Sequence, residues 1–140
     1  MNANIEVKNR LLEFGVKPSL QRMAIMAYLM DNLIHPNAET IFNHLYPLIP
    51  TLSKTTVYNT LKLLEEHGAI LAINIDEKNV RYDADISEHA HFKCKRCGVV
   101  YDLPVKGIEN LQIESPENLQ ITESRIYYKG YCEKCKKKMN

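Results

Sequence analysis

The sequence lacks any apolar run that approaches the roughly 18 residues needed to span a membrane. Its first ten residues, MNANIEVKNR, also lack the apolar core of a secretory signal peptide. There is no excess of basic residues either, because 18 Lys and Arg stand against 17 Asp and Glu. We therefore expect a cytoplasmic protein without a membrane partner, whose binding of any nucleic acid depends on a few locally placed charges.

The first half of the chain has the spacing of helices. Segments with helical periodicity cover residues 5–14, 19–32, 38–46 and 53–68, and prolines or glycines separate them. The second segment, SLQRMAIMAYLMDN, is apolar on most sides. Its apolar positions predict one buried stripe and a neighbouring one, formed by Leu20, Met23, Ala27 and Met30 and by Ile25, Tyr28 and Leu29.

The fourth segment, SKTTVYNTLKLLEEHG, has the features of a complete helix between a capping Ser53 and a terminating Gly68. Its helical spacing predicts a buried face of Val57, Leu61 and Leu64. The opposite face is polar and consists of Lys54, Thr55, Tyr58, Asn59 and Lys62. Such a face is often an ordinary solvated surface, and it is also what reading the major groove of DNA requires.

Two short β-type segments, AILAINI and VRYDAD, follow and are joined by the polar turn DEKN. Helices followed by a hairpin are the element order of a winged-helix DNA-binding domain. We predict an α+β protein with a winged-helix domain at residues 1–84, a hinge at 85–88 and a small α/β domain at 89–140. In that second domain we expect strands in HFKC, VVYDL and ITESRIYYKGYC, a helix near residues 107–113, and a frayed basic end, KCKKKMN.

Four cysteines form two C-x2-C pairs separated by 34 residues, and they are Cys94, Cys97, Cys132 and Cys135. In a reducing compartment such pairs are more often metal ligands than disulfides. Two such knuckles complete a tetrahedral thiolate cage with Zn–S bonds of about 2.3 Å. The spacing therefore predicts a closed, structural zinc site, with thiol redox pairs or an iron–sulfur cluster as the alternatives.

The stretch HAHFKC places two histidines one residue apart. Alternate residues of a strand point to the same side, so His89 and His91 share a face while Cys94 lies on the other. The histidines therefore indicate a second site, for which the candidate further ligands are Asp102, Asp83 and His35. Imidazoles and carboxylates suit Fe²⁺ or Mn²⁺ and tolerate Zn²⁺. We interpret His44 and His67 as structural.

The order of SKTTVYNTLKLLEEHG, RYD, HAHFKCKRCG, YD and GYCEKC along nearly the whole chain resembles the ferric uptake regulator family of metal-dependent winged-helix repressors. The resemblance implies a homodimer held together by the second half of the chain. It implies a structural zinc on the four cysteines. It also implies a regulatory metal on His35, Asp83, His89, His91 and Asp102. A metal with ligands from both halves would fix the angle between them, and hence the spacing of two recognition helices on a double-stranded DNA operator.

Within that family, Asp83 and Asp102 stand where the peroxide-sensing repressors carry Asp, whereas iron-sensing members usually carry Glu. Iron-sensing members also tend to have Asp between the two histidines and a His near position 124, and here these places hold Ala90 and Ser124. The resemblance thus implies a repressor that senses hydrogen peroxide through iron-catalysed oxidation of a histidine, His35 or His89. With Mn²⁺ in place of iron, the protein would repress without sensing peroxide.

For DNA contacts we expect Lys54, Thr55, Tyr58 and Asn59 at base edges or nearby phosphates, with Arg22 and Lys62 on the backbone. Three alternatives remain. One is an iron or zinc uptake repressor of the same family. Another is a metalloenzyme, because two histidines and a carboxylate with open positions also describe non-haem iron oxygenases. The third is a zinc-stabilised interaction module that does not bind DNA.

Overall fold

The computed structural model describes residues 2–76, 78–87, 89–107 and 117–139. The chain divides into two compact units, Met1–Ile86 and Ser87–Asn140. The boundary between them falls inside the stretch 85–88. The helix that we predicted near residues 107–113 lies outside the described residues from residue 108 onward.

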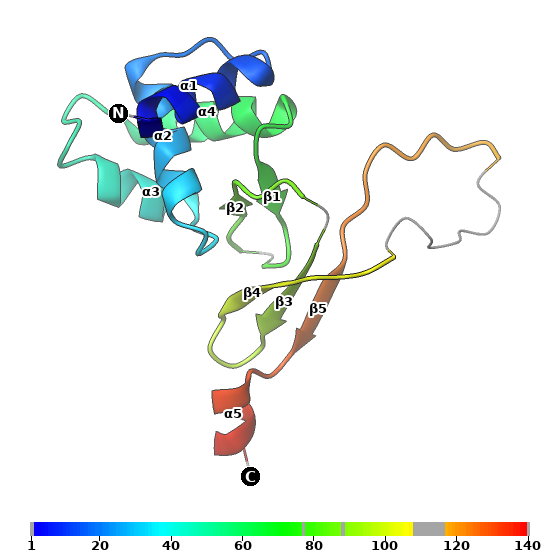
Figure 1. Cartoon of the computed structure of the whole chain (residues 1–140). Helices are drawn as coiled ribbons and strands as arrows, with labels where there is room; N and C mark the ends of the chain where they lie inside the picture. The colour runs from blue at the N-terminus through cyan, green and yellow to red at the C-terminus, as the bar shows by residue number, and fades with distance from the viewer. Residues whose placement is uncertain (1, 77, 88, 108–116, 140) are drawn as a thin grey trace. The chain divides into compact units, whose positions relative to one another are not determined.

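The first unit has the element order of a winged helix (Figure 1). Its helices are α1 (Asn2–Glu13), α2 (Leu20–Asp31), α3 (Ala38–Leu45) and α4 (Lys54–Glu66). Its wing is the antiparallel pair β1 (Leu71–Ile73) and β2 (Arg81–Asp83), in which Leu71 lies opposite Asp83.

Local side-chain bonds fix where these helices begin. Ser19, Asn37 and Ser53 adopt extended backbone conformations and accept hydrogen bonds from the backbone N–H groups three residues on. Each bond satisfies one of the N–H groups that a helix start leaves without an intrahelical partner. Gly68 follows α4 with φ of 79°, a left-handed conformation that glycine adopts without strain. The predicted caps of α4, Ser53 and Gly68, are thus confirmed.

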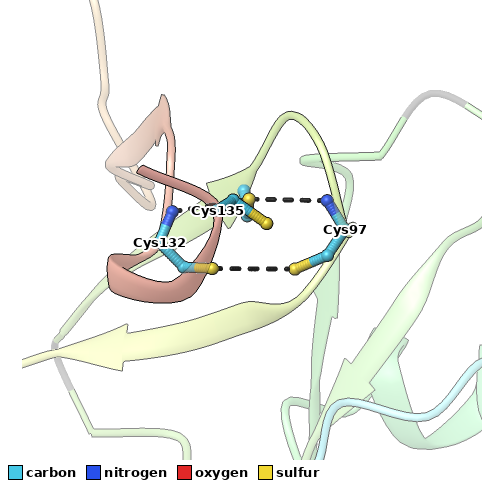
Figure 2. Close-up of side chains that lie close together, drawn as sticks. Cys97, Cys132 and Cys135 are labelled. Atoms are coloured by element: carbon cyan, nitrogen blue, oxygen red, sulfur yellow. Dashed lines mark hydrogen bonds between the residues drawn. The ribbon is translucent and has the colours of Figure 1, made fainter. Parts of the chain in front are cut away.

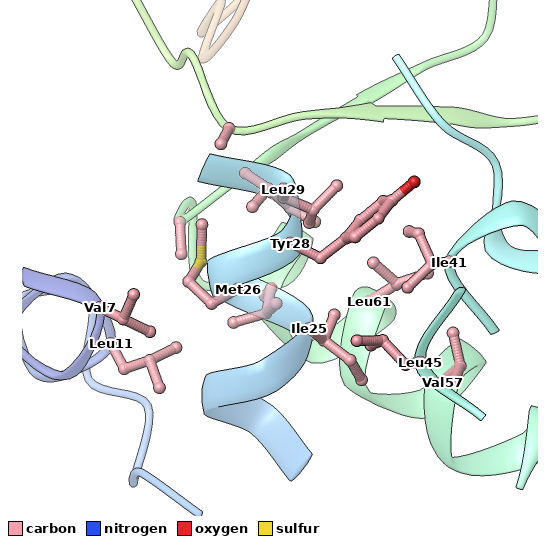
Figure 3. Close-up of a cluster of buried hydrophobic side chains, with 14 of the residues drawn as sticks. Val7, Leu11, Ile25, Met26, Tyr28, Leu29, Ile41, Leu45, Val57 and Leu61 are labelled. Atoms are coloured by element: carbon pink, nitrogen blue, oxygen red, sulfur yellow. The ribbon is translucent and has the colours of Figure 1, made fainter. Parts of the chain in front are cut away.

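The core of the first unit forms around α2 (Figure 3). Val7 and Leu11 of α1 lie on one side of this helix, and side chains of α3 and α4 lie on the other. The predicted buried face of α4 is confirmed, because Val57, Leu61 and Leu64 have no exposed surface.

The prediction for α2 put the buried stripe on the wrong side of the helix. Leu20 is 79% exposed and Met23, Ala27 and Met30 are only partly buried, whereas Ile25, Met26 and Leu29 are fully buried. The reason is that the other helices pack against the neighbouring stripe, and the stripe of Leu20 runs along the edge of the core.

The second unit is a three-stranded sheet with a short helix. The strands are β3 (Ala90–Cys94), β4 (Val100–Leu103) and β5 (Tyr127–Gly130), in the order β4-β3-β5, and α5 (Glu133–Lys138) follows. β3 pairs antiparallel with β4 and parallel with β5. His91 lies opposite Asp102 on one side and Tyr127 on the other.

Two predictions for this unit need correction. The strand expected in ITESRIYYKGYC begins only at Tyr127. It starts opposite His91, one residue after β3 begins at Ala90, so the two strands run together over nearly the full length of β3. The stretch KCKKKMN was expected to be frayed, but its residues up to Lys138 lie in helix α5. Buried Cys132 and Cys135 hold the start of this helix in place.

Among the described residues, the structure has no helix that combines the length and the apolar character needed to cross a membrane.

We expect Leu61→Ala to destabilise the first unit by about 2–5 kcal/mol, because it removes a fully buried side chain and leaves a cavity. Leu20→Ala is the matched control, since exposed substitutions usually change stability by less than about 0.5 kcal/mol. Urea unfolding followed by circular dichroism measures both. Equal losses for the two variants would contradict this description of the core.

Candidate metal centres and recognition helix

The four cysteines converge at one end of the second unit (Figure 2). All four sulfurs lie within 4.8 Å of one another, and Sγ of Cys97 is 3.8 Å from Sγ of Cys132. A tetrahedral zinc ion with bonds of about 2.3 Å would hold its sulfurs about 3.8 Å apart. The turn after β3 brings Cys94 and Cys97 together, and the start of α5 supplies Cys132 and Cys135. The donor set and its spacing therefore fit a closed zinc site.

Backbone N–H groups prepare one of these thiols for a metal. Cys97 N–H and Cys132 N–H point at Sγ of Cys94, with N···S distances of 3.5 and 3.4 Å. These bonds, first that from Cys97, lower the pKa of Cys94 to about 6 despite its burial. Burial instead raises the pKa of Cys135. The N–H bonds thus favour the thiolate of Cys94, which is the form that binds metal.

The two histidines meet on the opposite face of β3, as their spacing predicted. His89 Nε2 and His91 Nε2 are 3.0 Å apart, and each lies 3.2 Å from Oδ1 of Asp102 on β4. An octahedral ion with bonds of about 2.1 Å places neighbouring donor atoms about 3.0 Å apart. The three atoms thus have the spacing of one face of an octahedron, the facial two-histidine, one-carboxylate set that suits Fe²⁺.

A backbone carbonyl sets the tautomer of His89. Its Nδ1 lies 2.7 Å from the carbonyl oxygen of Ser87. A carbonyl oxygen only accepts, so Nδ1–H must be the donor, and Nε2 of the neutral ring is left with its lone pair directed at the triad. This contact could not be predicted from residue types, since any residue at position 87 would supply a carbonyl.

His35 and Asp83 meet within the first unit. His35 Nε2 lies 3.3 Å from Oδ2 of Asp83, and both residues are buried. Oδ1 of the same carboxylate accepts the backbone N–H of Asp85 at 2.9 Å. The loop reaches β2 because Tyr82 N–H donates to the Pro36 carbonyl at 2.9 Å. A buried imidazole beside a buried carboxylate is a pair of donors that a divalent cation can use.

The backbone at His35 is strained, with φ of 59° in the left-handed region that residues other than glycine rarely adopt. It is the non-glycine residue with positive φ in the described chain. Such strain persists where the surrounding structure holds it, and it concentrates at functional sites. The strained residue is thus the same one whose imidazole lies beside Asp83.

The polar face of α4 is open to solvent, as predicted. Lys54, Thr55, Tyr58, Asn59 and Lys62 are all exposed. They do not form one cluster: Asn59 lines a cavity of about 450 Å³ with Arg22 of α2, whereas Lys54 and Tyr58 line a smaller one of about 100 Å³ beside α3. Lys54 Nζ lies 5.6 Å from the centre of the Phe42 ring, which holds that cation on the α3 side.

Among the lining residues of the larger cavity that the sequence prediction did not name are Lys17 and Gln21, beside Arg22 on α2. Lys17 also orients Arg22, since its carbonyl accepts a hydrogen bond from Nη1 of Arg22 at 2.9 Å. The signal was present in the sequence, because residues 17, 21 and 22 flank the predicted start of one helix. This proximity could not be interpreted without knowing which part of α4 faces the start of α2.

The remaining histidines have local contacts. The ring of His44 packs against Tyr28 with centroids 4.6 Å apart. His67 Nδ1–H donates to the carbonyl of Phe14 at 2.9 Å. These contacts agree with structural roles.

Together these features define a class: a winged-helix protein whose second unit carries a thiolate cage and a separate histidine–carboxylate centre. The model of the Ferric uptake regulator family matches residues 13–129. The chain therefore belongs to the ferric uptake regulator family.

Individual relatives agree with this assignment. The peroxide operon regulator of Bacillus subtilis (strain 168) is 31% identical over 137 residues, which cover 96% of this chain and 94% of the relative. A solved structure concerned with peroxide sensing by PerR from Streptococcus pyogenes is 28% identical, with a TM-score of 0.53 and coverage of 95% and 92%. The ferric uptake regulator from Francisella tularensis with iron is 25% identical, with a TM-score of 0.71 and coverage of 88% and 96%.

We expect Ser53→Ala to destabilise the first unit by about 1 kcal/mol, because it removes the side-chain acceptor of the Thr56 N–H at the start of α4. Ser53→Asp keeps an acceptor there and should retain most of the stability. Chemical denaturation of the two variants measures the difference. A Ser53→Asp variant as unstable as Ser53→Ala would show that the capping bond is not what stabilises this helix start.

Proposed function

We propose that this protein is a metal-dependent, DNA-binding transcriptional repressor that senses hydrogen peroxide through iron-catalysed oxidation of one of its own histidines. The observation that carries the proposal is the triad of His89, His91 and Asp102, with donor spacing suited to an open Fe²⁺ site, in a chain that also has a winged helix. Similarity to the peroxide operon regulator of Bacillus subtilis supports it.

The proposed resident metals are two. Structural Zn²⁺ is held by the four cysteines, whose closed donor set leaves no position for a substrate. Regulatory Fe²⁺ or Mn²⁺ is held by one set of five ligands drawn from both units: His35, Asp83, His89, His91 and Asp102. The pair in the first unit and the triad in the second are each preassembled, which supports this ligand set.

Sharing one metal between the units gives the repressor its switch. Residues 85–88 form the hinge between the winged-helix domain, 1–84, and the dimerisation domain, 89–140. Metal binding favours the relative arrangement in which all five ligands meet, and so it selects one spacing of two recognition helices in a homodimer. Moving such an equilibrium from 1:99 to 99:1 requires roughly 5.5 kcal/mol of differential metal affinity.

Five nitrogen and oxygen donors from His35, Asp83, His89, His91 and Asp102 would hold Fe²⁺ and leave room for hydrogen peroxide. Bound iron would supply the redox catalysis that lets peroxide oxidise a neighbouring imidazole. In that net reaction the histidine loses two electrons, one peroxide oxygen is added to a ring carbon of His35 or His89, and the other oxygen leaves as water. Oxidised imidazole is a poorer donor, so the metal is lost and DNA is released. Mn²⁺ supports repression without this chemistry.

On DNA, the face of α4 supplies Lys54, Thr55, Tyr58 and Asn59 to base edges or nearby phosphates. Arg22 and Lys62 bind the backbone. The exposure of the five side chains on α4 supports their assignment, and Arg22 is partly exposed. The larger cavity adds Lys17 and Gln21 as neighbours of Arg22 and Asn59. The binding partner is a double-stranded operator, and we expect the protein to work in the cytoplasm.

The alternative within the family is an iron or zinc uptake repressor. Ala90 and Ser124 disfavour this alternative, because iron-sensing members tend to carry an Asp and a His as metal donors at these two positions. The alternative outside the family is a non-haem iron enzyme. It shares the same triad and would be favoured by turnover of a small substrate in excess over protein.

Removing one cage ligand should remove the zinc. We expect Cys132→Ser to lose its zinc and the ordered structure around α5, because thiolate sites of this kind contribute about 10–16 kcal/mol to the folding of small zinc modules. Glu133→Gln is the adjacent control, since Glu133 is exposed and lies outside the cage. Metal analysis per chain and circular dichroism measure both. Full retention of tightly bound zinc by Cys132→Ser would contradict the assignment.

Stoichiometric hydrogen peroxide should inactivate only the iron form. Zinc-replete protein is loaded in parallel with Fe²⁺ or Mn²⁺, and operator binding and peptide masses are followed. We expect loss of binding with one added oxygen on the peptide carrying His35 or His89, only with iron. His44, outside the proposed ligand set, is the internal control and should stay unmodified. Retained binding with unmodified His35 and His89 would instead favour a reversible sensor of metal availability.

A further inference from the structure

Positive charge is concentrated at the end of the second unit that carries the cysteine cage. Residues 93–97 and 129–138, here called the basic end, contain 8 Lys and Arg and one acidic residue, Glu133. The rest of the chain has 10 Lys and Arg against 16 Asp and Glu. The net charge of the chain is therefore near zero because a strongly basic region offsets an otherwise acidic protein.

The two stretches of the basic end are held together at one end of the sheet, with Lys93 and Lys129 on the face of His91 and the other lysines around the cage. Lys93 and Lys129 are register partners in the parallel pairing of β3 with β5. Lys95 N–H donates to the carbonyl of Gly130 at 2.7 Å. The cage then joins the turn after β3 to the start of α5 (Figure 2). The lysines are thus carried on a fixed frame rather than on a loose tail.

Local needs account for only part of this charge. Lys136, Lys137 and Lys138 lie in the last turn of α5, where cations interact favourably with the helix end. Four thiolates around Zn²⁺ carry a net charge of −2, which some lysines offset. These two effects do not explain why Lys95, Arg96, Lys129 and Lys134 are all basic and all exposed. Gathering so many like charges is unfavourable in the isolated chain, and a polyanion would relieve it.

The charge distribution points to DNA as that polyanion. The first unit, which carries α4, has 8 Lys and Arg against 10 Asp and Glu. It therefore lacks the charge excess that gives DNA-binding proteins their sequence-independent affinity. The basic end has the missing excess. An anionic membrane is less well matched, because α5 is EKCKKK and its one apolar side chain, Cys135, is buried in the cage.

We infer that the basic end is a second DNA-binding surface, which holds the phosphate backbone of duplex DNA without reading its sequence. This inference rests on the proposed function, because it assigns to that DNA-binding protein a further contact outside the winged helix.

The test is the salt dependence of binding to a mixed-sequence duplex of about 40 base pairs, four helical turns. Zinc-replete, Mn²⁺-loaded full-length protein is compared with Lys134→Gln/Lys138→Gln. The control, Lys8→Gln/Lys106→Gln, removes two exposed lysines elsewhere and gives the same net charge. Zinc content is measured for each variant, and Lys134→Arg/Lys138→Arg should restore wild-type behaviour.

Each phosphate contact contributes about 0.9 to the slope of log affinity against log salt, so losing two lowers the slope by about 1.8. Between 50 and 200 mM salt, wild-type affinity should then fall roughly tenfold more than that of the α5 variant. Unchanged slopes, or equal changes in the control, would overturn the inference. So would weaker binding of heparin with unchanged binding of DNA.

The probe contains no operator, so the two proposals fail separately. A protein that binds the mixed duplex through α5 but binds no operator in a metal-dependent way would sink the proposed repressor function and leave the second surface standing. If the protein binds its operator but Lys134→Gln/Lys138→Gln leaves binding of the mixed duplex unchanged, the second surface is wrong and the proposed repressor function stands.

Discussion

The pleat of β3 is the constraint on which the second unit depends. Five residues, Ala90–Cys94, send alternate side chains to opposite faces. His91 therefore joins Asp102 on one face, while Phe92 and Cys94 face the cage on the other. Phe92 lies so close over Gly130 that a Cβ there would be 3.2 Å from its ring, which ties β5 and the cage to this register. A shift by one residue would exchange the two faces and destroy both centres at once.

The first unit carries its own pair of metal donors, His35 and Asp83, and the backbone of His35 is strained. His35 is held in a strained backbone conformation, and its loop is bonded to β2 next to Asp83. The helical core, in which Leu61 and Ile25 are fully buried, has no need of that strain. We therefore connect the strain with metal binding. Under the proposed function, a ligand set divided between the two units would convert metal occupancy into their relative arrangement, and that arrangement would set the spacing of two recognition helices.

The sequence predicted the features that depend on local spacing: the cage from C-x2-C pairs, the parity of His89 and His91, and the buried face of α4. It did not predict features that depend on what lies opposite. Leu20 has the helical spacing of a buried position, but the other helices cover the neighbouring stripe of Ile25 and Leu29. β5 is short because β3 is short, and α5 is ordered because Cys132 and Cys135 anchor a stretch whose composition is typical of a frayed end. The Ser87 carbonyl that orients His89 could not be foreseen, since it belongs to the backbone.

The most direct test of the account is the Mn²⁺ binding isotherm of zinc-replete His35→Ala, compared with that of the wild type. The substitution changes the first unit and leaves the triad of the second intact. If one ion is shared by the two units, Mn²⁺ affinity should fall at least about tenfold, because even residues that only orient ligands contribute 10–100-fold. An isotherm identical to that of the wild type would mean that the second unit binds its metal alone, and the proposed coupling would then be wrong.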